Sequence, residues 1–340
     1  MILTLNCGSQ SVVIKSFKGD EEVDEFSLED LNDENYKDKL KQKLEELGKK
    51  YEGVEAVGHR VVHGGDQFKK TTLLDEDKIK QLEKYNHLAP LHNPNNLAGI
   101  KMAKKVFANA KQVAVFDTQF YSDLPEEARQ YALPKDIREK HNFKRFGFHG
   151  ISHEFTAKKA SQKAEISFKS SKIISAHLGG GCSVTAIKNG KAIDTSMGHT
   201  PLEGVVMMTR SGDVDPGIVL EIVKSEGIEE AEVLLNKKSG MIGLAGTQNM
   251  LKVLEDSEEE CGEAKLALKV FTYRIKKYIS SYYGVLGGCD LICFTGSIGN
   301  GDPKTRSMIL EGLPFAEEVE IVKVKPNEEL AIYKKVKSLI

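Results

Sequence analysis

Short apolar runs and turn residues alternate in the same order at two places along the chain. Residues 2–6 (ILTLN) and 12–17 (VVIKSF) are apolar runs of strand length that flank a Gly/Ser turn. Residues 173–177 (IISAH) and 184–187 (VTAI) repeat this order, and Asn189-Gly190 then leads into a further short run. Asn-Gly between two apolar runs is a strong signal for a β-hairpin. The pattern therefore predicts two similar hairpins.

The two Gly/Ser turns are candidates for anion binding. CGSQS at residues 7–11 and LGGGCS at residues 178–183 each follow the first strand of a predicted hairpin. Backbone N–H groups in such a turn can face a phosphate. Two such hairpins also arise by chance in α/β proteins, so the pattern alone leaves both interpretations open.

Amphipathic helices are predicted between and after these strands. Residues 35–53 carry leucines at helical spacing, and residues 263–284 carry an apolar stripe that ends at Gly287-Gly288. Residues 295–302 (TGSIGNGD) are expected to form a Gly-rich turn after a short strand, and the tail from Asn327 is expected to form a capped helix. The order predicts an α/β fold with two similar halves, and a cleft between such halves is the default ligand site.

Composition narrows the class of protein. The chain has 340 residues with 50 Asp/Glu and 48 Lys/Arg, a net charge of −2 that disfavours nucleic-acid and membrane partners. No apolar run reaches the roughly 18 residues of a membrane span, and the N-terminus lacks a basic leader region. The five cysteines show neither zinc-ligand nor disulfide spacing. We therefore expect a cytoplasmic, enzyme-sized protein of two domains.

Histidines and arginines are the most informative polar residues. The chain lacks the P-loop, HExxH and GxSxG signatures. One histidine in a polar loop is most often structural, but several near Arg60, Asp117 and Arg210 make a candidate site. Arginine suits phosphate or carboxylate recognition because its guanidinium presents a planar fork of donors. The histidines in question are His59, His63, His92, His149, His153, His177 and His199.

A series of long motifs follows in a fixed order: GHRVVHGGDQF, LAPLHNPNN, VFDTQF, RFGFHGISH, HLGGGCSV and DTSMGHTPLEGVVMMTRSGDVDP. With NCGSQS and NEEL near the two ends, the series resembles the acetate kinase family from Leu3 to about Ile332. The resemblance implies the sugar kinase–Hsp70–actin fold, two duplicated ribonuclease H-like domains around a nucleotide cleft. It implies a first domain over residues 1–149, a second with the nucleotide site over residues 150–328, and a terminal helix 329–340 that packs on the first.

The resemblance also implies direct, Mg²⁺-dependent transfer of a phosphoryl group from ATP to acetate, giving acetyl phosphate and ADP. Arg60 and Arg210 match the arginines that hold the carboxylate and the phosphoryl group. His149 matches the histidine that hydrogen-bonds that group, and Asp117 matches the catalytic aspartate. The acetate-binding positions are matched by Arg60, Val62, Leu91, His92, Phe148 and Pro201. Core packing is the alternative explanation for the apolar ones.

The metal and nucleotide positions can be matched in the same way. Asn6 and Glu328 match the pair associated with Mg²⁺, and Glu329 is an alternative to Glu328. The nucleotide-binding positions are Ser9, Ser11, His177, Leu178, Gly179, Gly180, Gly181, Met250, Leu251, Lys252, Ser297, Ile298, Gly299, Asn300 and Gly301. The resemblance further implies a homodimer.

The nucleotide positions depart from the family pattern. Val13 stands where the family has lysine, and Lys15 lies about 6.6 Å further along the strand. Gly180 replaces an asparagine, and Met250-Leu251-Lys252 lacks the family's acid and arginine. The chain is also shorter than is usual for the family. Three functions remain open: an ATP-dependent acetate kinase, a short-chain carboxylate kinase that uses pyrophosphate or another donor, and a non-catalytic protein that binds acyl phosphate or acetate.

Overall fold

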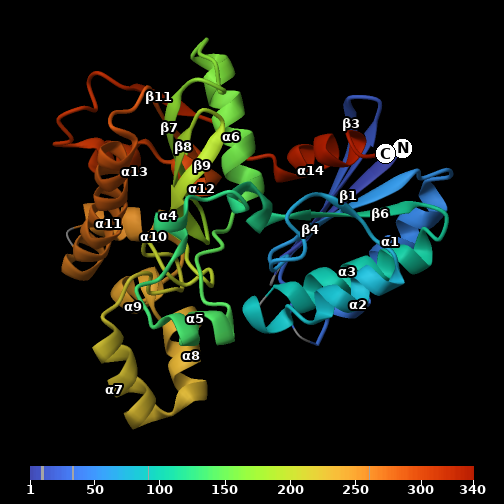
Figure 1. The fold of residues 1–340 in the computed structure, drawn as a ribbon, viewed down its shortest axis with the longest axis horizontal. Helices are drawn as coiled ribbons and strands as arrows, with labels where there is room; N and C mark the ends of the chain where they lie inside the picture. Colours follow the sequence, from blue (N-terminus) through green and yellow to red (C-terminus); the bar gives the residue numbers. More distant parts are fainter. Residues whose placement is uncertain (9–10, 33, 91, 260) are drawn as a thin grey trace. The chain divides into compact units, whose positions relative to one another are not determined.

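The computed structural model describes residues 1–8, 11–32, 34–90, 92–259 and 261–340 (Figure 1). Ser9 and Leu91, assigned above to nucleotide and acetate binding, lie outside the described residues. The chain divides into two compact units: Met1–Ser122 with Phe148–Ser152 and Asn327–Ile340, and Asp123–Gly147 with His153–Pro326. No helix in the described part of the chain has both the length and the apolar character needed to cross a bilayer.

The first unit is built on a six-stranded sheet with the order β3-β2-β1-β4-β6-β5. β1 pairs antiparallel with β2 and parallel with β4, and β4 pairs parallel with β6. The central strands β1, β4 and β6 are largely buried on both faces, as expected for strands covered on both sides. The strands are β1 (Ile2–Cys7), β2 (Val12–Lys18), β3 (Glu21–Leu28), β4 (Ala56–Val61), β5 (Thr72–Leu73) and β6 (Lys111–Phe116).

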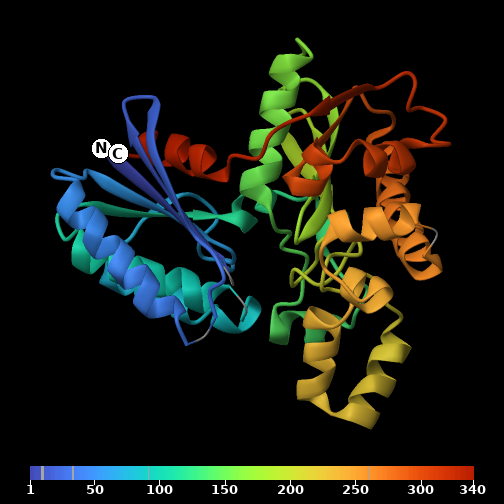
Figure 2. The ribbon, with the colours of Figure 1, turned by 180° about the vertical axis from the view of Figure 1, so that it is seen from behind.

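Helices cover both faces of this sheet (Figures 1 and 2). On one face, Leu40, Leu44 and Leu47 of α1 join Leu3 of β1 in a buried core, which confirms the predicted leucine stripe. On the other face, α14 packs against β1 and β4. The helices of the first unit are α1 (Tyr36–Lys50), α2 (Glu76–Glu83), α3 (Asn93–Val106) and α14 (Glu328–Lys337), with the 3₁₀ turns η1 (Asn86–Leu88) and η2 (Asp117–Tyr121).

The second unit repeats the plan of the first. Its five-stranded sheet has the order β11-β10-β7-β8-β9, with β7, β8 and β9 joined antiparallel and β10 parallel to β7 and β11. The same pairing directions join β1, β2, β3, β4 and β6, so the internal duplication is confirmed. Asn189 and Gly190 have φ values of 53° and 79° at the predicted hairpin turn. The strands are β7 (Lys172–Leu178), β8 (Cys182–Lys188), β9 (Lys191–Thr195), β10 (Leu291–Thr295) and β11 (Glu320–Lys323).

The long helix α11 (Gly262–Leu286) packs on this sheet and confirms the predicted apolar stripe. Leu268, Phe271, Ile275 and Ile279 are buried, and the helix ends at Gly287 in the left-handed conformation. The remaining helices, by chain position, are α4 (Glu126–Arg129), α5 (Lys135–His141), α6 (Gly150–Lys163), α7 (Pro216–Glu226), α8 (Ile228–Lys237), α9 (Gly240–Ala245), α10 (Met250–Glu258), α12 (Gly296–Gly301) and α13 (Pro303–Leu310).

The predicted Gly-rich turn at residues 295–302 is wrong, because most of this segment is the short helix α12. Gly296 has a φ of 83°, and a Cβ there would lie 2.2 Å from the backbone oxygen of Leu178. Only glycine accommodates both the conformation and the close approach. The chain can therefore turn sharply from β10 into a helix beside the end of β7.

Candidate functional site

Five polar residues meet at one edge of the first sheet. Asn6 lies near the end of β1, Arg60 near the end of β4, and Asp117 directly follows β6. Because β1, β4 and β6 are parallel neighbours, their carboxyl ends lie at the same edge. The first turn of α14 adds Glu328 and Glu329. We call these five residues the Arg60 cluster.

Arg60 forms the centre of the Arg60 cluster. Its Nε and Nη2 donate to Oδ2 of Asp117 at 3.1 and 2.7 Å. Its Nη1 donates to Oδ1 of Asn6 at 3.1 Å and lies 3.3 Å from Oε2 of Glu328. The amide nitrogen of Asn6 donates to Glu328 at 3.2 Å and to Glu329 at 2.9 Å. The structure thus brings together Asn6, Arg60, Asp117 and Glu328, and it adds Glu329.

The Arg60 cluster holds more acidic than basic groups. Burial raises the pKa of Asp117, although Arg60 opposes this effect. Burial and the neighbouring Glu328 raise the pKa of Glu329. Burial acts to lower the pKa of Arg60, but attraction to Asp117 and Glu328 outweighs it and raises the pKa overall. Three carboxyl groups beside one guanidinium leave negative charge that a further cation would balance.

The oxygen donors of the Arg60 cluster fit a hard divalent cation. Mg²⁺ is usually held by one or two carboxylates, with waters and substrate phosphates as its other ligands. Asn6, Glu328 and Glu329 supply amide and carboxylate oxygens of this kind. Among the described residues, no three His, Cys, Asp or Glu side chains are already arranged around one metal position. The residues therefore suit a cation that takes most of its ligands from waters and phosphates.

His149 is attached to the Arg60 cluster through its backbone. Its φ of 57° lies in the left-handed region that residues other than glycine rarely adopt, and its N–H donates to the Asp117 carboxylate. At Gly150, a Cβ would lie 2.2 Å from the backbone oxygen of Asp117. The buried Phe148 accepts a hydrogen bond from the Tyr121 hydroxyl through its carbonyl at 2.9 Å. These contacts hold the FHG segment against the residue that follows β6.

Two asparagines that the sequence analysis did not assign hold the segment after β4. Asn96 accepts from the N–H of Val62 at 3.0 Å and donates to the Cys7 carbonyl at 2.7 Å. Asn93 accepts from the N–H of His63 and donates to its carbonyl, both at 3.0 Å. The run NPNN was the available signal, because buried asparagines must be hydrogen-bonded. Both residues position the chain that carries the proposed acetate pocket.

The histidines of this region differ in their surroundings. His59 is buried beside Gln112, with 2.8 Å between Nε2 and Oε1, and burial lowers the pKa of His59 to about 4. His63 lies beyond β4, which ends at Val61. Its Nδ1 accepts from the N–H of Gly65 at 2.9 Å. His63 therefore shapes the loop after the strand.

In the second unit, Arg210 lies close to the glycine turn of the second hairpin. Its Nη1 donates to the Pro201 carbonyl at 2.6 Å. The N–H of Met208 donates to the carbonyl of Gly180 at 3.3 Å, which joins the segment before Arg210 to the turn. A Cβ at Gly180 would meet no atom within 4 Å, so this side of the turn is open. One guanidinium and one open glycine turn therefore belong to the same local structure.

The other positions of the second unit that were predicted to bind the nucleotide fall into two groups. A Cβ on Gly179 would lie 3.6 Å from the Ser297 hydroxyl, which places the start of α12 beside the turn that begins after His177 and Leu178. Arg306 donates to the carbonyls of Gly299 and Asn300 and so closes the end of α12, whose Ile298 is buried and Gly301 exposed. In contrast, Leu251 is exposed, and Lys252 pairs with Asp256 of its own helix at 3.0 Å.

The first lysine after the first glycine turn, Lys15, is engaged in ion pairs. The N–H of Gly8 donates to the carbonyl of Ser11 at 2.8 Å, which closes the turn. Nζ of Lys15 lies 3.1 Å from both Glu22 and Glu25 of the adjacent strand β3. Lys15 therefore pairs within its own hairpin, and Val13 supplies no charge in its place.

Comparison with known proteins identifies the relatives of this chain. A sequence profile of the acetokinase family matches residues 7–330. Acetate kinase of Thermosipho melanesiensis is 41% identical over 332 residues, which cover 96% of this chain and 79% of that protein. The crystal structure of Porphyromonas gingivalis acetate kinase has a TM-score of 0.90 at 33% identity, with 99% of each chain covered. That of a propionate kinase from Francisella tularensis has a TM-score of 0.87 at 34% identity, covering 100% of this chain and 99% of that one. The chain belongs to the acetokinase family.

Proposed function

We propose that the chain is an acetate kinase that transfers the γ-phosphoryl group of ATP reversibly to acetate, giving acetyl phosphate and ADP. The Arg60 cluster carries this proposal, because it combines a fork of donors for a carboxylate with oxygen ligands for a divalent cation. Membership of the acetokinase family supports the same reaction. The proposed location is the cytoplasm, where the five free thiols of the chain would stay reduced.

The reaction needs positioning and charge stabilisation more than covalent chemistry. A carboxylate oxygen of acetate attacks the γ-phosphorus in line as the bond from that phosphorus to the β-phosphate oxygen breaks. In the first unit, Arg60 would orient the carboxylate and His149 would donate to the phosphoryl oxygens. Asp117 would keep Arg60 in place through its two hydrogen bonds. In the second unit, Arg210 would stabilise charge on the phosphoryl group.

A Mg²⁺ ion would add to these effects by balancing charge on the donor phosphates. Asn6 and Glu328 are its proposed protein ligands, and the buried Glu329 accepts a hydrogen bond from Asn6. The ion would also offset the surplus of carboxyl groups around Arg60.

For the acetate methyl group we propose contacts with Val62 and Phe148 in the first unit and with Pro201 in the second. Leu91, which lies outside the described residues, and His92 keep the acetate-binding roles that the family resemblance implies. Val62 and Phe148 are buried, and His92 directly precedes α3. One extra methylene changes binding in an apolar pocket by about 1–3 kcal/mol. Propionate is therefore expected to be a poorer substrate than acetate, not an excluded one.

A second candidate is a carboxylate kinase with a donor other than ATP, such as pyrophosphate. Two observations favour it: Lys252 is engaged with Asp256, and Leu251 is exposed at the segment proposed to hold adenosine. Both kinases would share the Arg60 cluster, so only the donor differs between them.

We also propose that the chain forms a homodimer through α7 and α8. These helices expose apolar side chains, including Ile218, Leu220 and Ile228, which are 51%, 60% and 68% exposed. Neighbouring exposed apolar residues on a soluble protein often mark an interface.

Hydroxamate trapping of acyl phosphate tests these functions. The chain is assayed with ATP, GTP and pyrophosphate as donors, with acetate, propionate and butyrate as acceptors, and with Mg²⁺ or a chelator. Turnover with ATP and acetate supports the proposal, and turnover only with pyrophosphate supports the second candidate. No turnover with any donor would leave a non-catalytic binding protein. Arg210→Ala should lower kcat by orders of magnitude with the fold intact, and a change within about twofold contradicts its role.

A further inference from the structure

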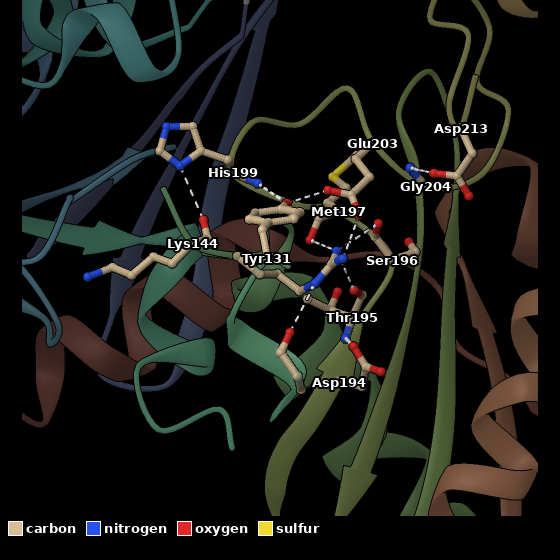
Figure 3. Close-up of polar contacts among 12 residues, drawn as sticks. Tyr131, Lys144, Asp194, Thr195, Ser196, Met197, His199, Glu203, Gly204 and Asp213 are labelled. Atoms are coloured by element: carbon tan, nitrogen blue, oxygen red, sulfur yellow. Dashed lines mark hydrogen bonds and ion pairs between the residues drawn. The ribbon is translucent and has the colours of Figure 1, made fainter. Parts of the chain in front are cut away.

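The guanidinium of Arg145 donates five hydrogen bonds in the second unit. Figure 3 labels four of the residues that accept them, Thr195, Ser196, Met197 and Glu203. Its Nη1 donates to three consecutive backbone carbonyls, those of residues 195–197, at 3.0, 3.2 and 2.9 Å. Its Nη2 pairs with Oε1 of Glu203 at 2.5 Å, and its Nε donates to the Ala128 carbonyl at 3.3 Å. A single guanidinium therefore binds both ends of the segment from residue 195 to residue 203.

The side chains of Glu203 and Tyr131 fill the space within the segment 195–203. The other carboxylate oxygen of Glu203 accepts from the Tyr131 hydroxyl, which itself accepts from the N–H of His199 at 2.9 Å. A Cβ at Gly198 would lie 1.7 Å from the Glu203 carboxylate and 2.2 Å from the Tyr131 hydroxyl. The turn is therefore tightly packed at Gly198, and a residue with a side chain would not fit there. Figure 3 shows Tyr131, His199 and Glu203 gathered in this arrangement.

Asp213 closes the next part of the chain. The N–H of Gly204 donates to Oδ1 of Asp213, and the N–H of Asp213 donates to the Gly204 carbonyl, both at 2.8 Å. Oδ2 of Asp213 accepts from the hydroxyl of Tyr278, on α11, at 2.7 Å. Residues 204–213 therefore form a second closed loop that begins where the first one ends.

Arg210 lies in this second loop, but its side chain donates a hydrogen bond to the first. Its Nη1 donates to the carbonyl of Pro201, which lies between Met197 and Glu203, both bound by Arg145. Its own carbonyl accepts from the N–H of Met207 at 3.1 Å. The Pro201 carbonyl is thus one of the groups that direct the Arg210 side chain, and it lies in the segment that Arg145 holds.

We propose that Arg145, with Glu203, is a positioning residue for Arg210: it fixes the turn that holds the Arg210 guanidinium in its reactive direction. The inference rests on the proposed function, in which Arg210 acts on the phosphoryl group. Lysine has a single nitrogen and could not reproduce three backbone contacts together with the carboxylate contact. The Arg145 and Glu203 side chains are 16% and 32% exposed, and an ion pair that water reaches contributes little to stability. Positioning is therefore the better explanation for so many directed contacts.

A double-mutant cycle separates positioning from general stability. Arg145→Lys is prepared in the natural chain and in the Arg210→Ala background, with radiolabelled acetate for the slow variants. If Arg145 acts through Arg210, Arg145→Lys lowers kcat at least tenfold in the natural chain and less than twofold when Arg210 is already absent. KM for the donor, which depends on other residues, should change by less than about threefold.

The controls address folding and surface effects. Arg138→Lys is the matched control, because Arg138 is half-buried like Arg145 but donates to the Leu133 carbonyl and to the Gln130 side chain, outside residues 195–203. It should leave kcat unchanged. Glu203→Gln keeps the shape of the carboxylate and replaces Arg145→Lys if the latter fails to fold, with the same loss expected.

The outcomes are distinct. The positioning role is overturned if Arg145→Lys lowers kcat by the same factor whether Arg210 is present or replaced. The same holds for Glu203→Gln if it is used instead. The proposed function is then left intact. An unchanged kcat when Arg145→Lys is made in the otherwise natural chain also overturns the positioning role. A natural chain without any turnover overturns the proposed function and this inference together.

Discussion

Gly58 lies where a strand of the first sheet closely approaches α14, and replacing it tests how the Arg60 cluster is held. Gly58 lies in β4, between β1 and β6, two residues before Arg60. A Cβ at this position would lie 2.6 Å from Cγ2 of Val336 and 2.9 Å from Cγ2 of Ile332. Both α14 side chains are fully buried, so neither can swing into solvent.

The size of the effect follows from these distances. Carbon atoms in contact are normally about 3.5–4.0 Å apart, so Gly58→Ala requires α14 to move by about 1 Å. Overpacking of this kind costs about 1–3 kcal/mol of unfolding free energy. The same helix begins with Glu328 and Glu329, which accept from Asn6 at 3.2 and 2.9 Å. A shift of about 1 Å would lengthen these bonds beyond normal hydrogen-bond range, so half-maximal activity should require more Mg²⁺.

Urea denaturation followed by circular dichroism measures the stability change. Gly284→Ala is the matched control, because no atom lies within 4 Å of its added methyl group and helix propensity favours alanine by up to about 1 kcal/mol. Val336→Ala removes the nearest methyl group. The double variant Gly58→Ala/Val336→Ala should therefore lose less unfolding free energy than the sum of the losses of the two single variants. A Gly58→Ala chain as stable as the natural one, or strictly additive effects, would refute the packing argument.

Three further predictions address other parts of the molecule. His59→Gln should flatten the pH dependence of stability, because the pKa of His59 is about 4 in the folded chain and 6.5 ordinarily. About 3 kcal/mol of unfolding free energy is therefore present above pH 6.5 and is lost as the pH falls to 4. Urea denaturation across this pH range measures the change, with the exposed His87→Gln as the control. Asn6→Ala should raise the Mg²⁺ concentration for half-maximal turnover, and an unchanged metal titration contradicts its assignment as a ligand. Leu220→Glu should convert a dimer into monomers in sedimentation experiments; a dimer that persists places the interface elsewhere.

Much of the local structure could be predicted from the chain alone. The Asn189-Gly190 hairpin and the buried stripe of α11 follow from interactions within a few residues, such as turn conformation and helical spacing. The segment 295–302 could not be predicted, because its helix depends on Gly296 lying against Leu178, more than a hundred residues earlier. Local patterns contain no information about such a contact.

In the candidate site as well, some features could be predicted from the sequence and others depend on distant contacts. Its residue types and family resemblance pointed to Arg60 and Asp117, but not to their two hydrogen bonds. The roles of Asn93 and Asn96 were also missed, because an asparagine in a motif shows its donors and acceptors but not its partners. The sequence also did not show that β3 places Glu22 and Glu25 beside Lys15.

The sequence by itself determined the strand and helix periods, the two hairpins, and the motifs that link the chain to the acetokinase family. Only the tertiary structure decided which side chains meet. The order of the parallel strands brings the ends of β1, β4 and β6 to one edge and creates the Arg60 cluster there. Likewise, Arg145 reaches residues 195–203 only in the folded second unit. Both cases have one physical cause: strand pairing and packing join residues that the chain itself keeps far apart.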